Sequence, residues 1–257
     1  MSEFKMPTEI VELPSKGLIY PEDNPLSSGN VEMKYMTAKE EDILTNQSYI
    51  QKGIVLDKLV ESLIVSNINY DDLIVGDKNA ILVAARVLGY GADYNFTYAG
   101  VEYDVDLSTL ENKEFDIDQA GTKGKNEFKF STPAGKVDIT FKILTHKDES
   151  DINKELEGYK KINPNNVPEV STRMKYMVTS VNGDTNKNTI RDFVDNHLLA
   201  RDARALRKYI SEIQPDVNMT FTTNSGQEVA IPIDLNFFWP DLKNSLTSPG
   251  RALYSNS

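Results

Sequence analysis

Residues 76–107 read GDKNAILVAARVLGYGADYNFTYAGVEYDVDL. Over about residues 77–88, apolar side chains recur at helical spacing and form one stripe of Ala80, Ile81, Ala84, Val87 and Leu88. Gly89 and Gly91 then end the helical pattern. Residues 94–98 and 101–107 alternate between apolar and polar types, with Ala99-Gly100 as a turn between them. The stretch therefore predicts a helix followed directly by a β-hairpin.

Residues 201–235 show the same order of patterns, with a helix predicted over 202–213 and a hairpin over 218–223 and 228–233. Asp77 and Asp202 open the two helices, and 19 residues after each comes a Phe-Thr pair that opens a strand. Upstream, Met33-Lys34-Tyr35-Met36 recurs as Met174-Lys175-Tyr176-Met177. These matches favour an ancient duplication of one module. The alternative is chance, combined with a shared order of helix and hairpin.

The segments around these two stretches add further short elements. Residues 31–36 alternate as a strand, and Thr37 with Glu40 forms a capping box at the start of a helix. Another hairpin is predicted over 127–131 and 136–144. Together the patterns predict an α+β fold of two related helix-plus-β-hairpin subdomains with extended N- and C-terminal arms. The predicted parts are an N-terminal arm (1–30), an N-terminal α+β subdomain (31–145), a helical linker (146–170), a C-terminal α+β subdomain (171–240) and a C-terminal tail (241–257).

The first 30 residues favour an extended arm because prolines and glycines interrupt every regular pattern. They nevertheless contain apolar residues, among them Leu18, Ile19 and Tyr20, which must be buried against something. A loop of this length in a compact domain is usually functional or disordered. Two readings stay open: the segment packs on the chain's own body, or it docks on a neighbouring molecule.

Composition excludes several classes of function. Acidic residues outnumber basic ones by 39 to 28, and the net charge of −11 repels phosphate backbones, so nucleic acid is not an expected partner. There is no cysteine and there are only two histidines, which excludes thiolate chemistry and a histidine-rich zinc site. No apolar run reaches the roughly 18 residues of a membrane span, and the N-terminus has no signal-peptide pattern. We expect no membrane association and no secretion.

The sequence contains no reactive constellation that predicts an enzyme, a cofactor or a metal site. Phosphate-binding, dinucleotide-binding and GxSxG motifs are all missing. Of the two histidines, His146 is predicted to lie at a solvated helix start, and His197 to be a core histidine on the apolar face of its helix. Pairs such as Asp116 and Asp118 lack the rest of a calcium loop. We therefore predict no catalytic residue, no metal ligand and no cofactor.

The strongest binding signal is the run Phe237-Phe238-Trp239-Pro240. Aromatic residues bury large areas and are typical anchors of interfaces. Consecutive side chains of a regular strand point to opposite faces, so at least one of these would dock outside the core. The alternative is an irregular segment in which all three aromatic residues cap the core.

Four blocks of this sequence resemble the T4-like phage baseplate protein family, whose members are described as baseplate hub subunits. The blocks are LPSKGLIYP (13–21), MTAKEEDILT (36–45), GDKN with AR and YG (76–91), and RDARALR, PD and FFWP (201–240). The similarity covers about residues 11–241 and weakens over 108–170. Some members carry cysteine pairs on the hairpins, which suggest zinc knuckles. The corresponding turns here, 97–100 and 222–226, have none, so that metal role is not expected in this chain.

The resemblance implies a non-enzymatic structural subunit of a contractile phage tail, in the central hub of the baseplate. Expected partners are other hub or tail-tube proteins, and a homo-oligomeric ring is possible within such an assembly. The expected location is the virion tail, and the host cytoplasm during assembly. One alternative is a hub assembly chaperone that leaves before the virion matures. Another is a tail hydrolase, which would need two carboxylates converging in one cleft.

Overall fold

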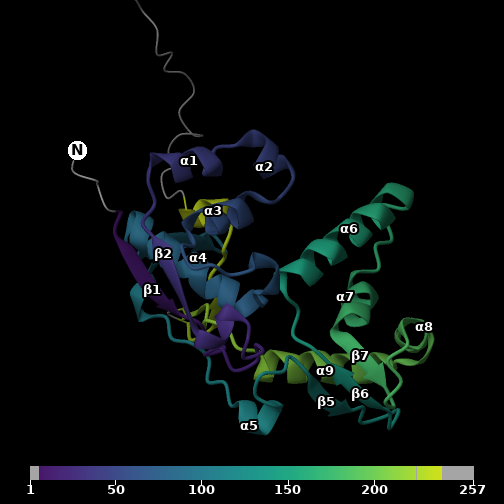
Figure 1. Cartoon of the computed structure of the whole chain (residues 1–257). Coiled ribbons are helices and arrows are strands. Elements are labelled where there is room, and N and C mark those ends of the chain that lie inside the picture. The colour runs from purple at the N-terminus through teal and green to yellow at the C-terminus, as the bar shows by residue number, and fades with distance from the viewer. Residues whose placement is uncertain (1–5, 224, 239–257) are drawn as a thin grey trace, which may run out of the picture.

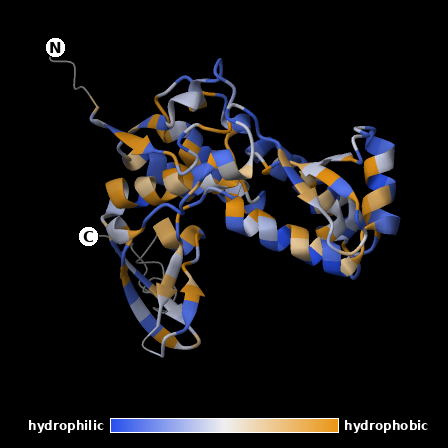
Figure 2. Ribbon diagram, turned by 90° about the horizontal axis from the view of Figure 1, so that it is seen from below, coloured by the Kyte–Doolittle hydropathy of each residue, from blue (hydrophilic) through white to orange (hydrophobic). Residues whose placement is uncertain are grey.

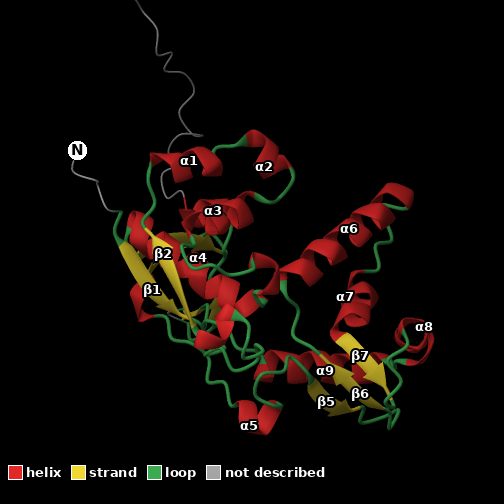
Figure 3. Ribbon diagram, in the orientation of Figure 1, coloured by secondary structure: helices red, strands yellow, loops and turns green. Residues whose placement is uncertain are grey.

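The computed structural model describes residues 6–223 and 225–238 (Figure 1). Helices form most of its regular structure, and the strands form small antiparallel sheets (Figure 3). This confirms the predicted α+β class. The α-helices are α1 (Ala38–Leu44), α2 (Gln47–Gln51), α3 (Val55–Leu63), α4 (Val75–Tyr90), α5 (Ile117–Ala120), α6 (His146–Ile162), α7 (Glu169–Met177), α8 (Lys187–Asp192), α9 (Ala200–Ile213) and α10 (Leu235–Phe238).

The strands and the tighter or wider helical turns connect these helices. The strands are β1 (Thr8–Glu12), β2 (Asn30–Lys34), β3 (Asp93–Tyr98), β4 (Val101–Asp106), β5 (Phe128–Ser131), β6 (Asp138–Phe141), β7 (Val178–Val181), β8 (Thr220–Thr222) and β9 (Glu228–Ala230). The 3-10 turns are η1 (Pro25–Ser28), η2 (Tyr70–Asp72) and η3 (Leu107–Thr109), and η4 (Phe193–His197) is a π-helical turn.

The helix-then-hairpin order predicted at residues 76–107 and 201–235 is confirmed at both places. Helix α4 leads into the β3–β4 hairpin, which turns through Ala99 and Gly100, and α9 leads into the β8–β9 hairpin. The two hairpins meet: the ring of Phe221 lies 6.1 Å from that of Phe96 and 5.3 Å from that of Tyr103, between centroids. Segments far apart in the sequence therefore share one aromatic core.

The N-terminal segment is not an extended arm. Strand β1 pairs with β2 in register Thr8↔Lys34 through Glu12↔Asn30, and the loop between them buries Leu13, Ile19 and Leu26 completely. Its backbone groups are also satisfied internally, for example by the bond from Leu13 N–H to Gly29 O at 2.8 Å. The prolines and glycines that suggested an arm instead shape a compact loop, because its apolar side chains find space in the chain's own core.

The second lobe comprises α6 to α9 and the β5-β6-β7 sheet, which lie together on the right of Figure 1. In this sheet β6 pairs with both β5 and β7, so strands from both sides of the predicted linker belong to one sheet. Residues 146–170 are not a linker: α6 packs on α7 around a small apolar cluster that includes Ile152 and Leu156. The predicted boundaries fail here because strand pairing joins segments that are distant in sequence.

A β-bridge and a polar contact join the second lobe to the first lobe, which consists of β1, β2 and α1 to α4. Ile74 forms an antiparallel bridge with Thr145, and His146 N–H donates to Leu73 O at 2.7 Å. Apolar and polar positions share the same helices (Figure 2), as expected for helices that bury one face. Among the described residues, none of the helices is both long and apolar enough to cross a membrane.

One part of the proposed repeat is wrong. Met33 and Lys34 lie on strand β2, whereas Met174–Met177 lies in helix α7, so the two MKYM tetrapeptides do not occupy equivalent places. The match arose from residue identity alone, without the surrounding hydrophobic period that decides strand or helix.

Candidate functional site

Two of the three residues predicted to bind a partner from the N-terminal segment are buried in this chain. Ile19 is fully buried, Tyr20 is 5% exposed, and Leu18 is half-buried against the same core. The Tyr20 hydroxyl donates to Asp77 Oδ2 at 2.6 Å and accepts from Ile74 N–H at 3.1 Å. The predicted docking role of this segment is therefore corrected: it closes the chain's own core.

The part of the aromatic run that the structure describes, Phe237 and Phe238, is also buried in this chain's own core. Phe237 and Phe238 are both fully buried, and the ring of Phe237 lies 5.0 Å from that of Tyr94. The argument from a regular strand fails because α10 is a helical turn, in which neighbouring side chains are about 100° apart and can enter one core. Trp239 and Pro240 lie outside the described residues.

Asp77 is the polar centre that holds the N-terminal loop. It is the third residue of α4 and fully buried, and it accepts hydrogen bonds from Ser15 N–H at 2.9 Å, Ser15 Oγ at 2.7 Å and the Tyr20 hydroxyl. Burial raises the pKa of Asp77 to about 6, although the hydrogen bonds from Tyr20 and Ser15 oppose the rise. Burial and the neighbouring Asp77 also raise the pKa of Tyr20. This arrangement fixes the loop and exposes no reactive group.

A second polar cluster lies in a cleft of about 550 Å³ lined by α3, α4 and α6. Asp57 Oδ1 accepts from the Tyr70 hydroxyl at 2.9 Å and from Lys78 Nζ at 3.1 Å, and His146 Nδ1 lies 3.6 Å away. The His146 side chain is 14% exposed, so the prediction of a solvated histidine is wrong. Burial lowers its pKa, with Asp57 opposing. The cluster joins both lobes, since α6 belongs to the second.

His197 is also placed differently from the prediction. Its side chain is 64% exposed, and Nε2 lies 3.3 Å from Asp192 Oδ2. The apolar period that predicted a core position assumed an α-helix. The chain instead forms the wider π-helical turn η4, which rotates the later residues away from that face.

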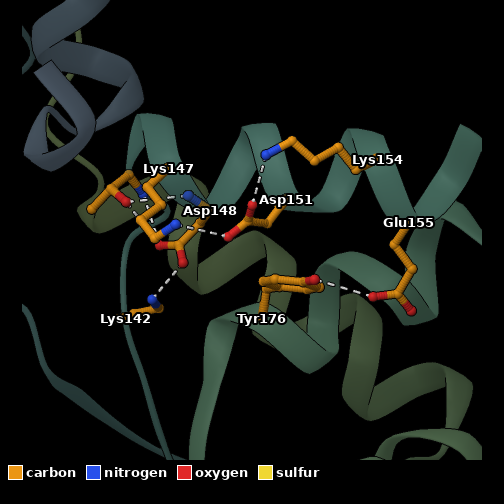
Figure 4. Close-up of polar contacts among 8 residues, drawn as sticks. Lys142, Lys147, Asp148, Asp151, Lys154, Glu155 and Tyr176 are labelled. Atoms are coloured by element: carbon orange, nitrogen blue, oxygen red, sulfur yellow. Dashed lines mark hydrogen bonds and ion pairs between the residues drawn. The ribbon is translucent and has the colours of Figure 1, made fainter.

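A charged network runs along α6 and reaches Tyr176 of α7 (Figure 4). Lys147 and Lys154 both contact Asp151, at 3.2 Å and 3.1 Å, and the Tyr176 hydroxyl donates to Glu155 at 3.1 Å. A pocket of about 430 Å³ beside it mixes acidic with basic side chains. Because the charges pair within and between α6 and α7, the network stabilises the packing of these helices.

The candidate interaction surface of the first lobe is an apolar groove between strand β1 and helix α4, which we call the edge groove. Its volume is about 270 Å³. Strand β1 lines it with residues 9–12, and the rest of its lining comes from α4 and from two segments beyond it: Ala80, Val83, Ala84, Val87, Leu88, Leu110, Asn112 and Val217. Ala84, Val87 and Leu88 remain only half-buried, although the sequence predicts Ala84, Val87 and Leu88 to lie on the helix's apolar stripe. The groove is therefore apolar surface that the described chain leaves uncovered.

The described residues contain no group of three or more His, Asp or Glu side chains arranged to hold a metal ion. Comparison of the chain with protein-family models, curated proteins and solved structures finds no match. The candidate function is therefore argued from the residues and geometry of this chain.

Sequence reasoning missed the edge groove and the Asp57 cluster for different reasons. The groove had a signal: an apolar stripe on α4 beside a segment that alternates over residues 8–12. The Asp57 cluster had none, because Asp57 and Lys78 meet through the packing of α3 on α4, and His146 joins them only at the junction of the two lobes.

Proposed function

We propose that this protein is a structural subunit of a contractile phage tail baseplate, in the central hub region, and that it acts by docking on other hub or tail-tube proteins. It would be part of the virion tail after assembly in the host cytoplasm, as one copy or as a member of a homo-oligomeric ring. The proposal starts from the four sequence blocks that resemble the T4-like baseplate family.

One observation carries the proposal: the resembling blocks contact one another in space. Ser15 and Tyr20 of the first block bind Asp77 of the third. Asn79 of the third block donates to Asp216 of the fourth at 3.0 Å. Short sequence matches that arise by chance are not expected to contact one another in the fold. Conserved blocks that form the core of a family are expected to do so.

The close approach of two blocks at Gly76 supports the same reading. A Cβ atom at this position would lie 1.8 Å from Pro215 O, so only glycine lets the start of α4 pass this backbone. Glycine in the third block and the Pro-Asp pair in the fourth are thus two halves of one contact. Contacts between the blocks support the proposal that the chain shares the core of this family and, with it, the family's structural role.

Mass spectrometry of purified intact tails tests the proposal. Peptides of this chain are expected at a fixed copy number relative to the tail-tube protein, and that number would give the symmetry of its ring. Lysate from the same infection, before particle purification, provides the matched control for expression. If the chain is found in assembly intermediates but not in finished tails, its role is that of an assembly chaperone and not of a structural subunit. Absence from both would contradict the proposal.

A further inference from the structure

The register of the β1–β2 hairpin determines which backbone groups of β1 face outward. Leu13 N–H bonds to Gly29 O, and Tyr35 N–H bonds to Pro7 O. Since hydrogen-bonded pairs alternate along an antiparallel ladder, Glu9 and Val11 also direct their backbone groups towards β2. The N–H and C=O groups of Thr8, Ile10 and Glu12 therefore point away from β2, along the outer edge.

This outer edge is open within the described chain. None of the six outward groups of Thr8, Ile10 and Glu12 bonds to any described residue. The other side of the hairpin is covered, because Glu32 O accepts from Val65 N–H at 2.8 Å and Glu32 N–H donates to Ser66 Oγ at 2.8 Å. Natural proteins usually protect such an edge, since unpaired strand groups are a template for another strand.

The edge groove lies on the face of the hairpin to which Val11 points. Val11 packs against the core together with its partner Val31, while Ile10 on the opposite face is 70% exposed. A strand added beside β1 would lie about 4.8 Å beyond it. Every second side chain of that strand would enter the groove over Ala84 and Val87. Backbone bonds and an apolar pocket for alternate side chains are the two requirements of strand addition.

The charges around the groove indicate the occupant. Glu9 and Glu12 both line it, and the chain carries a net charge of −11. A second copy of β1 fits poorly, because its own groove-facing residues are Glu9 and Val11 and a carboxylate would enter an apolar pocket. A basic segment with apolar residues at alternate positions satisfies both the pocket and the carboxylates.

We propose that the free edge of β1 and the edge groove bind an extended segment of another protein by strand addition, with apolar side chains at alternate positions and Lys or Arg beside Glu9 and Glu12. This deepens the proposed docking function and rests on it for the identity of the partner as a tail protein. The binding mode itself follows from the edge, the groove and the charges.

Peptide binding to the purified full-length protein tests the mode. The probe is a fluorescent peptide, Val-Thr-Lys-Thr-Val-Lys-Val, whose two lysines have the same spacing as Glu9 and Glu12, followed by anisotropy. We expect saturable binding that weakens with salt, because screening reduces the attraction to the two carboxylates. The same peptide with glutamates replacing its lysines, and one N-methylated at alternate backbone positions, should each bind at least tenfold more weakly. Equal binding of all three peptides overturns the proposal.

Substitutions place the binding on the edge. Ile10→Pro removes an outward N–H and leaves the bonds to β2 intact, as proline is tolerated where the strand N–H faces solvent. It should weaken binding at least tenfold, with an unchanged circular dichroism spectrum. If Ile10→Pro fails to fold, Ala84→Asp tests the groove without altering the edge. The matched control is Ile162→Ala, which removes an apolar side chain that is 84% exposed elsewhere and should change nothing.

Amide hydrogen exchange and the oligomeric state distinguish the two other occupants of the edge, which are a segment of the same chain and a second copy of it. In the free protein, the amide protons of Thr8, Ile10 and Glu12 should exchange rapidly, whereas slow exchange would show that the chain covers its own edge and would overturn the proposal. If dimers form with rising concentration and are lost in Ile10→Pro, the occupant of the edge is a second copy of this chain and not another protein. All these tests use purified protein, so a negative result would contradict the binding mode without affecting the copy number measured in tails. Conversely, absence from tails would contradict the proposed structural role without affecting the binding mode.

Discussion

Two strand-to-strand loops in this protein differ greatly in length, yet each is held by an aspartate at the same position of a helix. The loop between β1 and β2 spans residues 13–29, and the loop between β5 and β6 spans 132–137. Asp77 and Asp202 are each the third residue of their helix, α4 and α9, and each is buried. The first accepts from Ser15 and Tyr20, and the second accepts from Ala134 N–H and Gly135 N–H, both at 2.8 Å.

The difference between the two contacts follows from loop length. A six-residue turn directs two backbone N–H groups at one carboxylate without help from side chains. A long loop has more freedom and is fixed by hydroxyl groups as well as by burial of apolar residues such as Ile19. The helix start favours a negative charge in both places. The same anchoring position can therefore hold either a tight turn or a loop that contributes to the core.

A second parallel lies where each hairpin leads into a helix. Lys34, Thr37 and Glu40 in the first lobe have the same spacing as Lys142, Thr145 and Asp148 in the second, and in each the Thr N–H and hydroxyl donate to the acidic side chain. This correspondence differs from the MKYM match and fits the hairpins, the caps and the aspartates together. The duplication stays a prediction, now with a different alignment upstream.

Of the changes that compare the two loops, removal of either aspartate should lower the free energy of unfolding most. Asp77→Ala leaves Ser15 N–H and the Tyr20 hydroxyl buried without their acceptor and should lower the free energy of unfolding by about 4 kcal/mol. Asp202→Ala affects two N–H groups of a short turn and should cost about 2 kcal/mol. Denaturant unfolding followed by circular dichroism measures both, with Glu157→Ala on the exposed face of α6 as control. Equal losses would show that loop length does not matter.

Glycine substitutions compare the loops themselves. Gly17 has φ of +72° and a Cβ there would lie 2.4 Å from Ser27 O, so Gly17→Ala combines backbone strain with a clash and should cost roughly 3 kcal/mol or more. At Gly135 the nearest atom to a Cβ would be Asp202 Oδ2 at 3.2 Å, and Gly135→Ala should cost about 1 kcal/mol or less. Thermal unfolding under identical conditions measures both. A larger loss at Gly135 would reverse the comparison.

Acid titration isolates the burial of Asp77. Its pKa of about 6 lies above the roughly 3.9 of an unfolded aspartate, so between these values the folded state binds more protons. Its contribution is therefore present at low pH and is lost as pH rises from about 4 to 6. The unfolding free energy of the wild type should fall relative to Asp77→Asn by up to about 3 kcal/mol across this window. A flat difference would mean that Asp77 titrates normally.

The sequence predicted local structure better than it predicted burial by distant contacts. Both helix-and-hairpin stretches and the Thr37 cap are read correctly, because period, turn residues and capping boxes act within a few residues. For the N-terminal segment the sequence leaves packing on the chain's own body and docking on a neighbour equally open, since its partner, Asp77, lies 57 residues beyond Tyr20. His197 was misjudged since a π-helical turn leaves no distinct period in the sequence. Contacts between segments distant in the sequence, and a change from an α-helical to a π-helical turn, leave no pattern in the neighbouring residues.

The smallest expected difference is between the two cap ion pairs. Lys34 Nζ lies 2.8 Å from Glu40 Oε1, and Glu40 is fully shielded, whereas Lys142 Nζ lies 2.7 Å from an Asp148 side chain that is 13% exposed. Burial alone would raise the pKa of Glu40, but hydrogen bonds from Lys34 and Thr37 outweigh it and lower the pKa. A pair whose hydrogen bonds stabilise the ionised carboxylate against the effect of burial should show measurable coupling.

Double-mutant cycles with Lys34→Met and Glu40→Gln, and with Lys142→Met and Asp148→Asn, measure that coupling. We expect about 1 kcal/mol for the first pair and about half of that for the second, because solvent screens the more exposed pair. Since the pKa of Glu40 is lowered, its coupling is present at neutral pH and should disappear as pH falls below the ordinary value of about 4.3. Equal coupling would show that the two caps are energetically interchangeable despite their different burial. Stronger coupling in the second pair would mean that screening by solvent does not control these contacts.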